Sequence, residues 1–264
     1  MKMQPIEKPE IKPLSLRQHV ERIHFQIRHP LRFRVVVNRI KKHKAIFVHI
    51  PKSAGTSIRE SLFGGGGAHR TIAGFQAVLS PQLFAECFKF TFVRNPWDRL
   101  VSAFFYLKNQ NMMSNQRWAR ENLSKFEDFH TFVTRWLTRE NLWSYVLFRP
   151  QYHFICFEGR QPAVDFIGFY ENLASDFTVI CNHIKSSAKL EEKNRNSQRR
   201  DYCEYYTDET RHLVAKLYAE DIELFGYNFD NSSLPTQLAT RDHTPMTVGQ
   251  ASCRPPFSFS GSET

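Results

Sequence analysis

Short apolar runs that end in small or polar residues organise much of the chain. One run covers residues 45–50, and a second covers residues 89–94. Mainly apolar runs of this length are typical of strands that are buried on both faces of a parallel sheet. We therefore predict a single α/β domain of three layers, in which helices cover both faces of a short parallel sheet.

Helical spacing of apolar residues marks the segments between and after these runs. Residues 124–137 carry an aromatic stripe, which is either a core face or a platform for a sugar ring. Residues 208–225 are predicted to form the last long helix. Thr207 or Asp208 can cap its start, and Gly226 can end it.

The two ends of the chain differ from this central region. Residues 1–43 contain prolines, then a helical pattern, then a run of arginine and lysine, and we expect a basic extension. It either touches a membrane surface or a polyanionic acceptor, or packs as a short helix followed by a solvated basic linker. Residues 44–230 are expected to form the domain. Residues 231–264 are rich in polar residues and proline, and we expect a disordered tail.

The loop after the first run has the composition of an anion-binding turn. Small residues let the backbone approach a phosphate, the first N–H groups of the following helix lack intrahelical acceptors, and a lysine adds a full charge. The order differs from that of a Walker A loop, in which the lysine follows the glycines. The candidate phosphate ligands are Lys52, Ser53, Ala54, Gly55, Thr56 and Ser57.

A second candidate anion site follows the second run. Arg94 stands at the carboxyl end of the predicted strand, where open α/β sheets bind ligands. Asn95 and Pro96 suit the N-cap and first turn of a helix, and Ser102 lies about two turns into it. Alternatively, Arg94 forms a surface ion pair with Asp98. Taken with the first loop, the arrangement favours a two-point clamp on a nucleotide.

Residues 50–57 and 92–102 together resemble the cofactor-binding signature of the sulfotransferases. The variant is that of the carbohydrate group, which includes heparan 2-O- and chondroitin sulfotransferases and bacterial relatives. Residues 165–173 resemble the family's strand and helix start after the acceptor region, and residues 202–227 resemble its last helix, so that the resemblance spans about residues 45–230. It implies a P-loop-like sulfotransferase fold.

The resemblance also implies how each motif acts. The sulfuryl donor would be 3′-phosphoadenosine 5′-phosphosulfate, with loop 52–57 on its 5′-phosphosulfate and with Arg94 and Ser102 on its 3′-phosphate. By analogy with phosphoryl transfer, positioning and electrostatics would supply most of the catalysis. Lys52 would stabilise the charge that builds on the leaving phosphate oxygen. A sulfuryl group carries less charge than a phosphoryl group, so no metal ion is expected.

A base is also required, because the acceptor hydroxyl must lose its proton. His69 is our candidate. It follows four glycines between the two motifs, and it resembles in position the catalytic histidine of relatives of the heparan 2-O type. The alternative for His69 is a solvated loop residue. His49 is expected to pack at the end of the first strand, and His153 is an alternative base on the acceptor side.

The acceptor side is expected in the middle of the chain. Gln151 and His153 precede an apolar run at 154–157 that is predicted to be a strand. Their position resembles the family's short Pro-Gln segment beside the acceptor cleft, which implies an acceptor contact for Gln151. Residues 191–200 resemble a family loop that folds over the nucleotide, or else form a flexible basic loop. The candidate contacts in that loop are Asn196, Ser197, Arg199 and Arg200.

Composition narrows the classes of partner. The chain of 264 residues has a formal net charge of +10, which favours anionic ligands such as acidic glycans. No recognised nucleic-acid-binding motif is present, so we expect no nucleic acid partner. No apolar run has the length of a spanning helix, and five scattered cysteines suit a reducing compartment. We expect a cytoplasmic enzyme, or one of the Golgi lumen if the sequence is part of a longer chain.

Two other classes of function remain open at this point. A P-loop kinase of a small metabolite would bind ATP with magnesium, although the Gly-Lys-Ser/Thr order of such kinases is absent. A non-catalytic module for nucleotides or polyanions would use Arg94 and Ser102 but would not need Lys52 or His69. The favoured prediction is a sulfotransferase that uses 3′-phosphoadenosine 5′-phosphosulfate and acts on a carbohydrate hydroxyl.

Overall fold

The computed structural model describes residues 30–108, 116–157, 161–190 and 200–240. The predictions for the N-terminal helical pattern, for the tail beyond residue 240 and for Asn196, Ser197 and Arg199 lie outside these residues.

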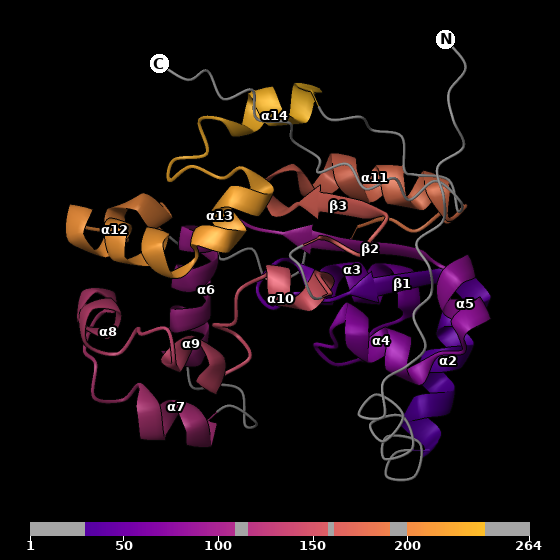
Figure 1. Cartoon of the computed structure of the whole chain (residues 1–264), viewed down its shortest axis with the longest axis horizontal. Helices are drawn as coiled ribbons and strands as arrows, with labels where there is room; N and C mark the ends of the chain where they lie inside the picture. Colours follow the sequence, from indigo (N-terminus) through magenta and orange to yellow (C-terminus); the bar gives the residue numbers. More distant parts are fainter. Residues whose placement is uncertain (1–29, 109–115, 158–160, 191–199, 241–264) are drawn as a thin grey trace.

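The centre of the molecule is a parallel sheet. It consists of β1 (Ala45–Val48), β2 (Phe88–Val93) and β3 (Phe166–Phe169), in that spatial order (Figure 1). Val48 pairs with Thr91, so the carboxyl ends of β1 and β2 lie next to each other. β1 and β2 fall on the two apolar runs, and β3 falls within residues 165–173, where the resemblance implied a strand. The predicted α/β class with a short parallel sheet is confirmed.

Helices make up most of the remaining described chain. In order they are α2 (Pro30–His43), α3 (Gly55–Phe63), α4 (Ile72–Val78), α5 (Pro81–Glu86), α6 (Pro96–Lys108), α7 (Gln116–Asn122), α8 (Phe129–Arg135), α9 (Asn141–Ser144), α10 (Tyr152–Ile155), α11 (Leu173–His183), α12 (Asp208–Leu217), α13 (Ala219–Phe225) and α14 (Leu234–Thr240). Short 3₁₀ turns, Tyr170–Asn172 and Tyr202–Tyr205, precede α11 and α12.

Several helix ends follow directly from local sequence. The Asn95 side chain accepts a hydrogen bond from Trp97 N at 3.0 Å and caps α6. Thr207 caps α12 in a reciprocal capping box with Thr210. Gly226 ends α13 in the left-handed conformation that glycine adopts without steric cost. The caps predicted at these three positions are confirmed.

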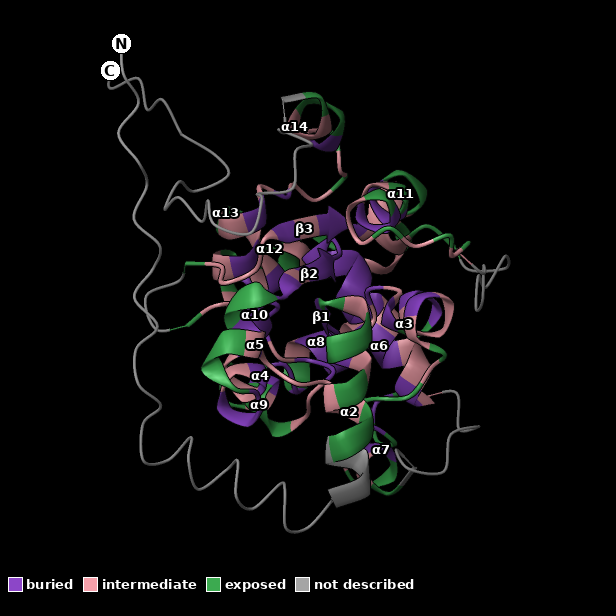
Figure 2. Ribbon diagram, turned by 90° about the vertical axis from the view of Figure 1, so that its right-hand side faces the viewer, coloured by how far each residue is buried: buried purple, intermediate pink, exposed green. Residues whose placement is uncertain are grey.

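Helices cover both faces of the sheet, because successive strand residues point in opposite directions. On one face, Phe90 and Phe92 share a buried cluster with side chains of α3 and α11. On the other face, Ile46 and Val48 share a cluster with side chains of α4, α5, α10 and α13. Figure 2 shows the buried strands between these helices. The predicted three-layer arrangement is therefore observed.

A third core fills the helical half of the molecule, where α6, α8 and α12 meet (Figure 1). The aromatic stripe at 124–137 lies in this core, since Phe126, Phe129, Phe132 and Trp136 are at most 7% exposed. Phe132 and Trp136 stack with ring centroids 5.2 Å apart. The stripe is a core face and not a sugar platform.

The strand predicted at residues 154–157 is wrong. The chain forms the helical turn α10 there, and only Cys156 makes an isolated bridge, to Pro162. The reason is tertiary, because the buried carboxylate of Asp221 accepts hydrogen bonds from the N–H groups of Gln151 and Tyr152. These are donors that a helical turn leaves without intrahelical acceptors.

The single helix predicted at residues 208–225 is also wrong in part. It is divided into α12 and α13 at Tyr218, whose backbone leaves the helical conformation with φ −111° and ψ 25°. The Tyr218 hydroxyl points inward and donates to Phe148 O at 2.7 Å. This buried hydrogen bond fixes the break.

Two terminal segments are more ordered than expected. The basic segment predicted as a solvated linker forms helix α2, in which Ile40 is buried against the sheet cluster. Residues 234–240 of the predicted disordered tail form α14, with Leu234 buried in the same cluster. In both segments a few apolar side chains anchor a mostly polar helix, which composition alone did not indicate.

Among the described residues, no helix combines the length and the apolar character needed to cross a membrane. The same residues contain no group of three or more His, Cys, Asp or Glu side chains arranged to hold a metal ion.

Candidate functional site

The loop between β1 and α3 has a strained backbone. Lys52 and Ala54 have φ values of 67° and 59°, and a left-handed conformation costs a non-glycine residue about 1–2 kcal/mol. Strain of this kind is concentrated at ligand-binding sites. Ile58 N donates to Ala54 O at 3.2 Å, so α3 begins immediately after the bend. The loop therefore leads into a helix N-terminus, as the sequence predicted.

The interior of this loop holds an unpaired hydroxyl group. Ser53 is 1% exposed, and its Oγ has no hydrogen-bond partner in the part of the protein that the structure describes. A buried polar group without a partner costs about 1–3 kcal/mol. An oxygen atom of a bound anion at the loop would supply the missing partner.

Gly55 lies against the ring of His49. A Cβ atom at Gly55 would be 1.8 Å from His49 Cδ2, which is far inside van der Waals contact. The His49 ring is 7% exposed and stacks on Phe47. The loop can therefore pack against β1 only when residue 55 has no side chain.

We predict that Gly55→Ala destabilises the protein by about 1–3 kcal/mol, because the added methyl group overpacks the space beside His49. Chemical denaturation measures the change in the free energy of unfolding. Ala54→Gly is the matched control, since glycine relieves a positive φ at the neighbouring position and should be neutral or stabilising. If Gly55→Ala were as stable as the wild type, the tight packing of the loop on His49 would be contradicted.

Arg94 is buried at the end of β2, with 7% of its side chain exposed. Its Nε donates to Asp98 Oδ2 at 2.7 Å, and its Nη1 donates to Lys52 O at 3.0 Å. The guanidinium lies 3.9 Å from the centroid of the Tyr170 ring. Burial lowers the pKa of Arg94, but the charge and hydrogen bond of Asp98, together with Tyr170 and Glu171, outweigh it, so the pKa of Arg94 is raised. The ion pair considered from the sequence is present, but it is buried instead of lying at the surface.

The hydrogen bond from Arg94 to Lys52 O joins the two sequence motifs. Ser102 is half-buried on α6, and its hydroxyl has no hydrogen bond to any described residue. Arg200 is exposed, and within the described ranges no contact joins it to Arg94 or to the loop. The structure thus brings together the loop and Arg94, but does not bring Arg200 to them.

His69 lies beside the same loop and contacts His49. The two ring centroids are 4.3 Å apart, and His69 Nδ1 lies 3.2 Å from His49 O. A carbonyl oxygen only accepts hydrogen bonds, so Nδ1 carries the proton and Nε2 keeps a free electron pair. Burial lowers the pKa of His69, and the nearby positive charges of Arg59 and Lys52 lower it further, which together outweigh the hydrogen bond to His49 O. His69 is therefore neutral at neutral pH.

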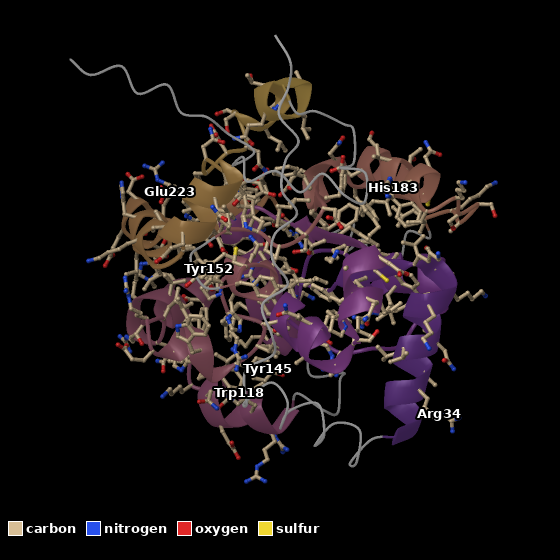
Figure 3. All side chains as sticks on the ribbon, turned by 45° about the vertical axis from the view of Figure 1, so that its right-hand side comes forward. Arg34, Trp118, Tyr145, Tyr152, His183 and Glu223 are labelled. Atoms are coloured by element: carbon tan, nitrogen blue, oxygen red, sulfur yellow. The ribbon has the colours of Figure 1, made fainter. Side chains whose placement is uncertain are left out.

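The ammonium group of Lys52 lies over an aromatic ring. Lys52 Nζ is 3.7 Å from the centroid of Tyr106, a half-buried residue of α6. Next to this position in the helical half, Tyr145 stacks on Trp118 with centroids 4.2 Å apart (Figure 3). The Tyr106 ring holds the lysine on the side of the loop that faces the helical half of the protein.

Gln151 is placed differently from the expectation. It is 0% exposed, and its side-chain amide is bonded to the backbone of Arg94 through both polar atoms. A buried side chain bonded in this way is not available to an acceptor, so the expected acceptor contact of Gln151 is corrected to a contact with the backbone of Arg94. His153 is half-buried and meets the partly exposed Trp143 edge to face, with centroids 5.0 Å apart.

Some side chains of this region were missed from the sequence. Glu171 accepts hydrogen bonds from Asn95 N at 2.7 Å and from the Tyr227 hydroxyl at 2.9 Å, and so holds the start of α6. Its place shortly after the β3 run is the same kind of signal that identified Arg94. Tyr106 and Asp221 gave no comparable signal, because their roles depend on partners far away in the chain.

The profile of the sulfotransferase family matches residues 37–228, which include both loops and every strand of the sheet. No curated protein and no solved structure gives a significant match to the chain. The matched stretch is well over half of the chain, and it contains the connected loops described above. The chain therefore belongs to the sulfotransferase family.

Proposed function

We propose that the protein transfers a sulfuryl group from 3′-phosphoadenosine 5′-phosphosulfate to a hydroxyl group of a carbohydrate. The observation that carries this proposal is the hydrogen bond from Arg94 Nη1 to Lys52 O. It holds the loop that carries Lys52 and the side chain of Arg94, two cationic elements, side by side at adjoining strand ends. A nucleotide with anionic groups at both ends requires two such sites, and membership of the sulfotransferase family supports this class of donor.

The 5′ end of the donor fits the loop 52–57. The Oγ of Ser53 has no hydrogen-bond partner among the described residues, and the first turn of α3 directs its backbone N–H groups towards the same loop. The helix dipole adds partial positive charge at the same place. When bound, the donor supplies the sulfuryl group together with a phosphate as leaving group.

The 3′ end of the donor fits Arg94 and Ser102. A planar guanidinium presents several N–H donors to a phosphate, and Arg94 Nη2 has no hydrogen bond to a described residue. The Ser102 hydroxyl adds a neutral donor. Ser197 and Arg200 remain proposed as further nucleotide contacts, on the resemblance of their loop alone.

Lys52 and His69 would carry the chemistry. Lys52 donates a hydrogen bond to the phosphate oxygen from which the sulfuryl group departs, and stabilises the charge that develops there. His69 accepts the proton of the acceptor hydroxyl at Nε2, because its Nδ1 already donates to His49 O. His153, next to Trp143, is proposed to contact the acceptor.

Calorimetric titration without metal ions tests the donor. We expect 3′,5′-bisphosphoadenosine to bind more tightly than ATP, because only the former carries a 3′-phosphate. Selective binding of ATP would instead support a kinase. Incubation with the donor and a library of glycans and metabolites, followed by mass spectrometry, identifies the acceptor. Lys52→Ala is the control for catalysis, and equal turnover by this variant would favour a non-catalytic role for the loop.

A further inference from the structure

A mostly buried, irregular stretch at residues 147–151 joins the helical half of the protein to the end of β2. Arg99 donates to two of its carbonyl oxygens, at 3.1 and 2.8 Å, and the Tyr218 hydroxyl donates to a third at 2.7 Å. Backbone groups that are removed from water need partners of this kind. The stretch is therefore held from α6 and from the break between α12 and α13.

The last residue of the stretch holds the backbone of Arg94. Gln151 Oε1 accepts from Arg94 N at 2.9 Å, and Gln151 Nε2 donates to Arg94 O at 2.8 Å. The amide thus binds the peptide groups on both sides of the Arg94 Cα atom. Because these groups fix φ and ψ of Arg94, they fix the direction in which its side chain leaves β2.

Asp221 of α13 holds Gln151 in turn. Asp221 Oδ2 accepts from Gln151 N at 2.7 Å, and Oδ1 accepts from Tyr152 N at 2.9 Å. Both Asp221 and Gln151 are 0% exposed. Buried carboxylates are rare in proteins, and hydrogen bonds to a charged acceptor are stronger than neutral ones. Three buried hydrogen bonds therefore connect Asp221 with the backbone of Arg94: one from Gln151 N to Asp221, and two between the Gln151 side chain and Arg94.

We propose that Gln151 and Asp221 are positioning residues that aim the Arg94 guanidinium, and thereby set the selectivity of the enzyme for a nucleotide that carries a 3′-phosphate. The inference rests on the proposed function of Arg94. It goes beyond that function by assigning the selectivity to two residues that touch no substrate.

The charge of Asp221 is part of this arrangement. Burial raises the pKa of Asp221 to about 6, although Arg99 and the two N–H bonds oppose the shift. The other titratable groups near it are Glu220 on the same helix, Cys156 and Tyr218. At neutral pH both carboxylate oxygens of Asp221 accept hydrogen bonds, one from Gln151 N and one from Tyr152 N. Below about pH 6 the carboxyl group becomes protonated and offers one N–H group a hydroxyl, so one bond of the chain weakens.

Two variants test the proposal through two nucleotides. For folded Gln151→Ala and Asp221→Asn, we expect binding of 3′,5′-bisphosphoadenosine to weaken about 10- to 100-fold, the value of one charge-assisted hydrogen bond. Adenosine 5′-monophosphate lacks the 3′-phosphate, and its affinity should stay within about twofold. Tyr218→Phe is the matched control, because it removes a buried hydrogen bond from the same stretch without touching the path to Arg94. The ratio of the affinities of Tyr218→Phe for 3′,5′-bisphosphoadenosine and for adenosine 5′-monophosphate should equal that of the wild type.

The outcomes separate this inference from the proposed function. If the wild type itself binds both nucleotides equally, the proposed role of Arg94 fails. If the wild type discriminates and the two variants discriminate equally well, or lose both affinities in parallel, the positioning role fails. If Tyr218→Phe loses selectivity as much as Gln151→Ala, general loosening of the stretch explains the effect and the inference is overturned.

Gln151→Glu gives a second test if the first variants do not fold. The carboxylate of this variant can accept a hydrogen bond from Arg94 N, but it repels Arg94 O. The protonated acid can accept from Arg94 N and also donate to Arg94 O, as the Gln151 amide does. Selectivity relative to wild type should therefore be low at about pH 8 and recover towards pH 6, since burial raises a carboxyl pKa. The titration of the nucleotide is common to both proteins and cancels in the ratio. A ratio that does not change with pH would contradict the proposal.

Discussion

Replacing His69 with alanine is expected to lower kcat about 10²- to 10⁴-fold, which is the usual contribution of a positioned general base. The bond from Nδ1 to His49 O fixes the tautomer, so the free electron pair is on Nε2. Alanine removes the base but leaves Ser53, Arg94 and the backbone of the loop in place. Steady-state kinetics and calorimetry should therefore show a large fall in kcat with unchanged affinity for 3′,5′-bisphosphoadenosine.

His153→Ala is the control for this experiment, because His153 was the other histidine considered as a base. We expect it to change KM for the acceptor more than kcat, since it lies with Trp143 on the acceptor side. His49→Ala is a poorer control, because the His49 ring supports Gly55. Full activity of His69→Ala, or a larger fall in kcat for His153→Ala, would transfer the base to another residue.

The pH dependence of the wild type tests the same assignment. Burial lowers the pKa of His69 below its ordinary value of 6.5. The base is active only when neutral, so kcat should rise with pH through an apparent pKa below 6.5 and be constant near neutrality. The residual activity of His69→Ala should lack this rise. An activity that first appears above pH 7 would mean that His69 does not act as the base.

The parts of the fold that the sequence predicted are those determined by local pattern. The two apolar runs became β1 and β2 because each has enough β-branched and aromatic residues to be buried on both faces. The strand at β3 was indicated by the resemblance of residues 165–173. The caps at Asn95, Thr207 and Gly226 were predictable because each uses the side chain or the conformational freedom of one residue. The neighbouring position of the two loops follows from parallel pairing of β1 and β2.

The parts that were missed depend on partners distant in sequence. The run at 154–157 looks like a strand, but the carboxylate of Asp221, about 70 residues later, binds the N–H groups that begin α10. The break at Tyr218 depends on the carbonyl of Phe148. The secondary-structure propensity of a segment does not include contacts with distant residues, and these contacts can override it.

The candidate site shows the same division. That the loop of Lys52 lies beside Arg94 could be predicted from the strand ends, and the place of His69 beside this loop was expected from its position between the motifs and from the resemblance. The burial of the Arg94–Asp98 pair could not be predicted, because an i, i+4 ion pair has the same sequence pattern at the surface and in the interior. Gln151 was selected from the sequence as an acceptor contact, but its amide is bonded to the backbone of Arg94. The sequence pattern does not show in which direction a side chain points.

Arg94→Gln is expected to have the largest effect on nucleotide binding and on stability together. Loss of the guanidinium should weaken binding of 3′,5′-bisphosphoadenosine by at least about 10- to 100-fold. It should also lower the free energy of unfolding by about 3–5 kcal/mol, because Asp98 is left buried without its cation. Calorimetry and chemical denaturation measure the two effects separately.

The double variant with Asp98→Asn separates recognition from folding. It removes both charges of the pair, so no uncompensated charge remains buried and much of the lost stability should return. The affinity for 3′,5′-bisphosphoadenosine should stay low, because neutral amides cannot replace the charge on the phosphate. Adenosine 5′-monophosphate should bind the double variant about as well as it binds the wild type. If restoring stability also restored the affinity for the bisphosphate, Arg94 would serve the fold and not the 3′-phosphate. If both affinities stayed low, the bond from Arg94 to Lys52 O would matter mainly for the shape of the loop.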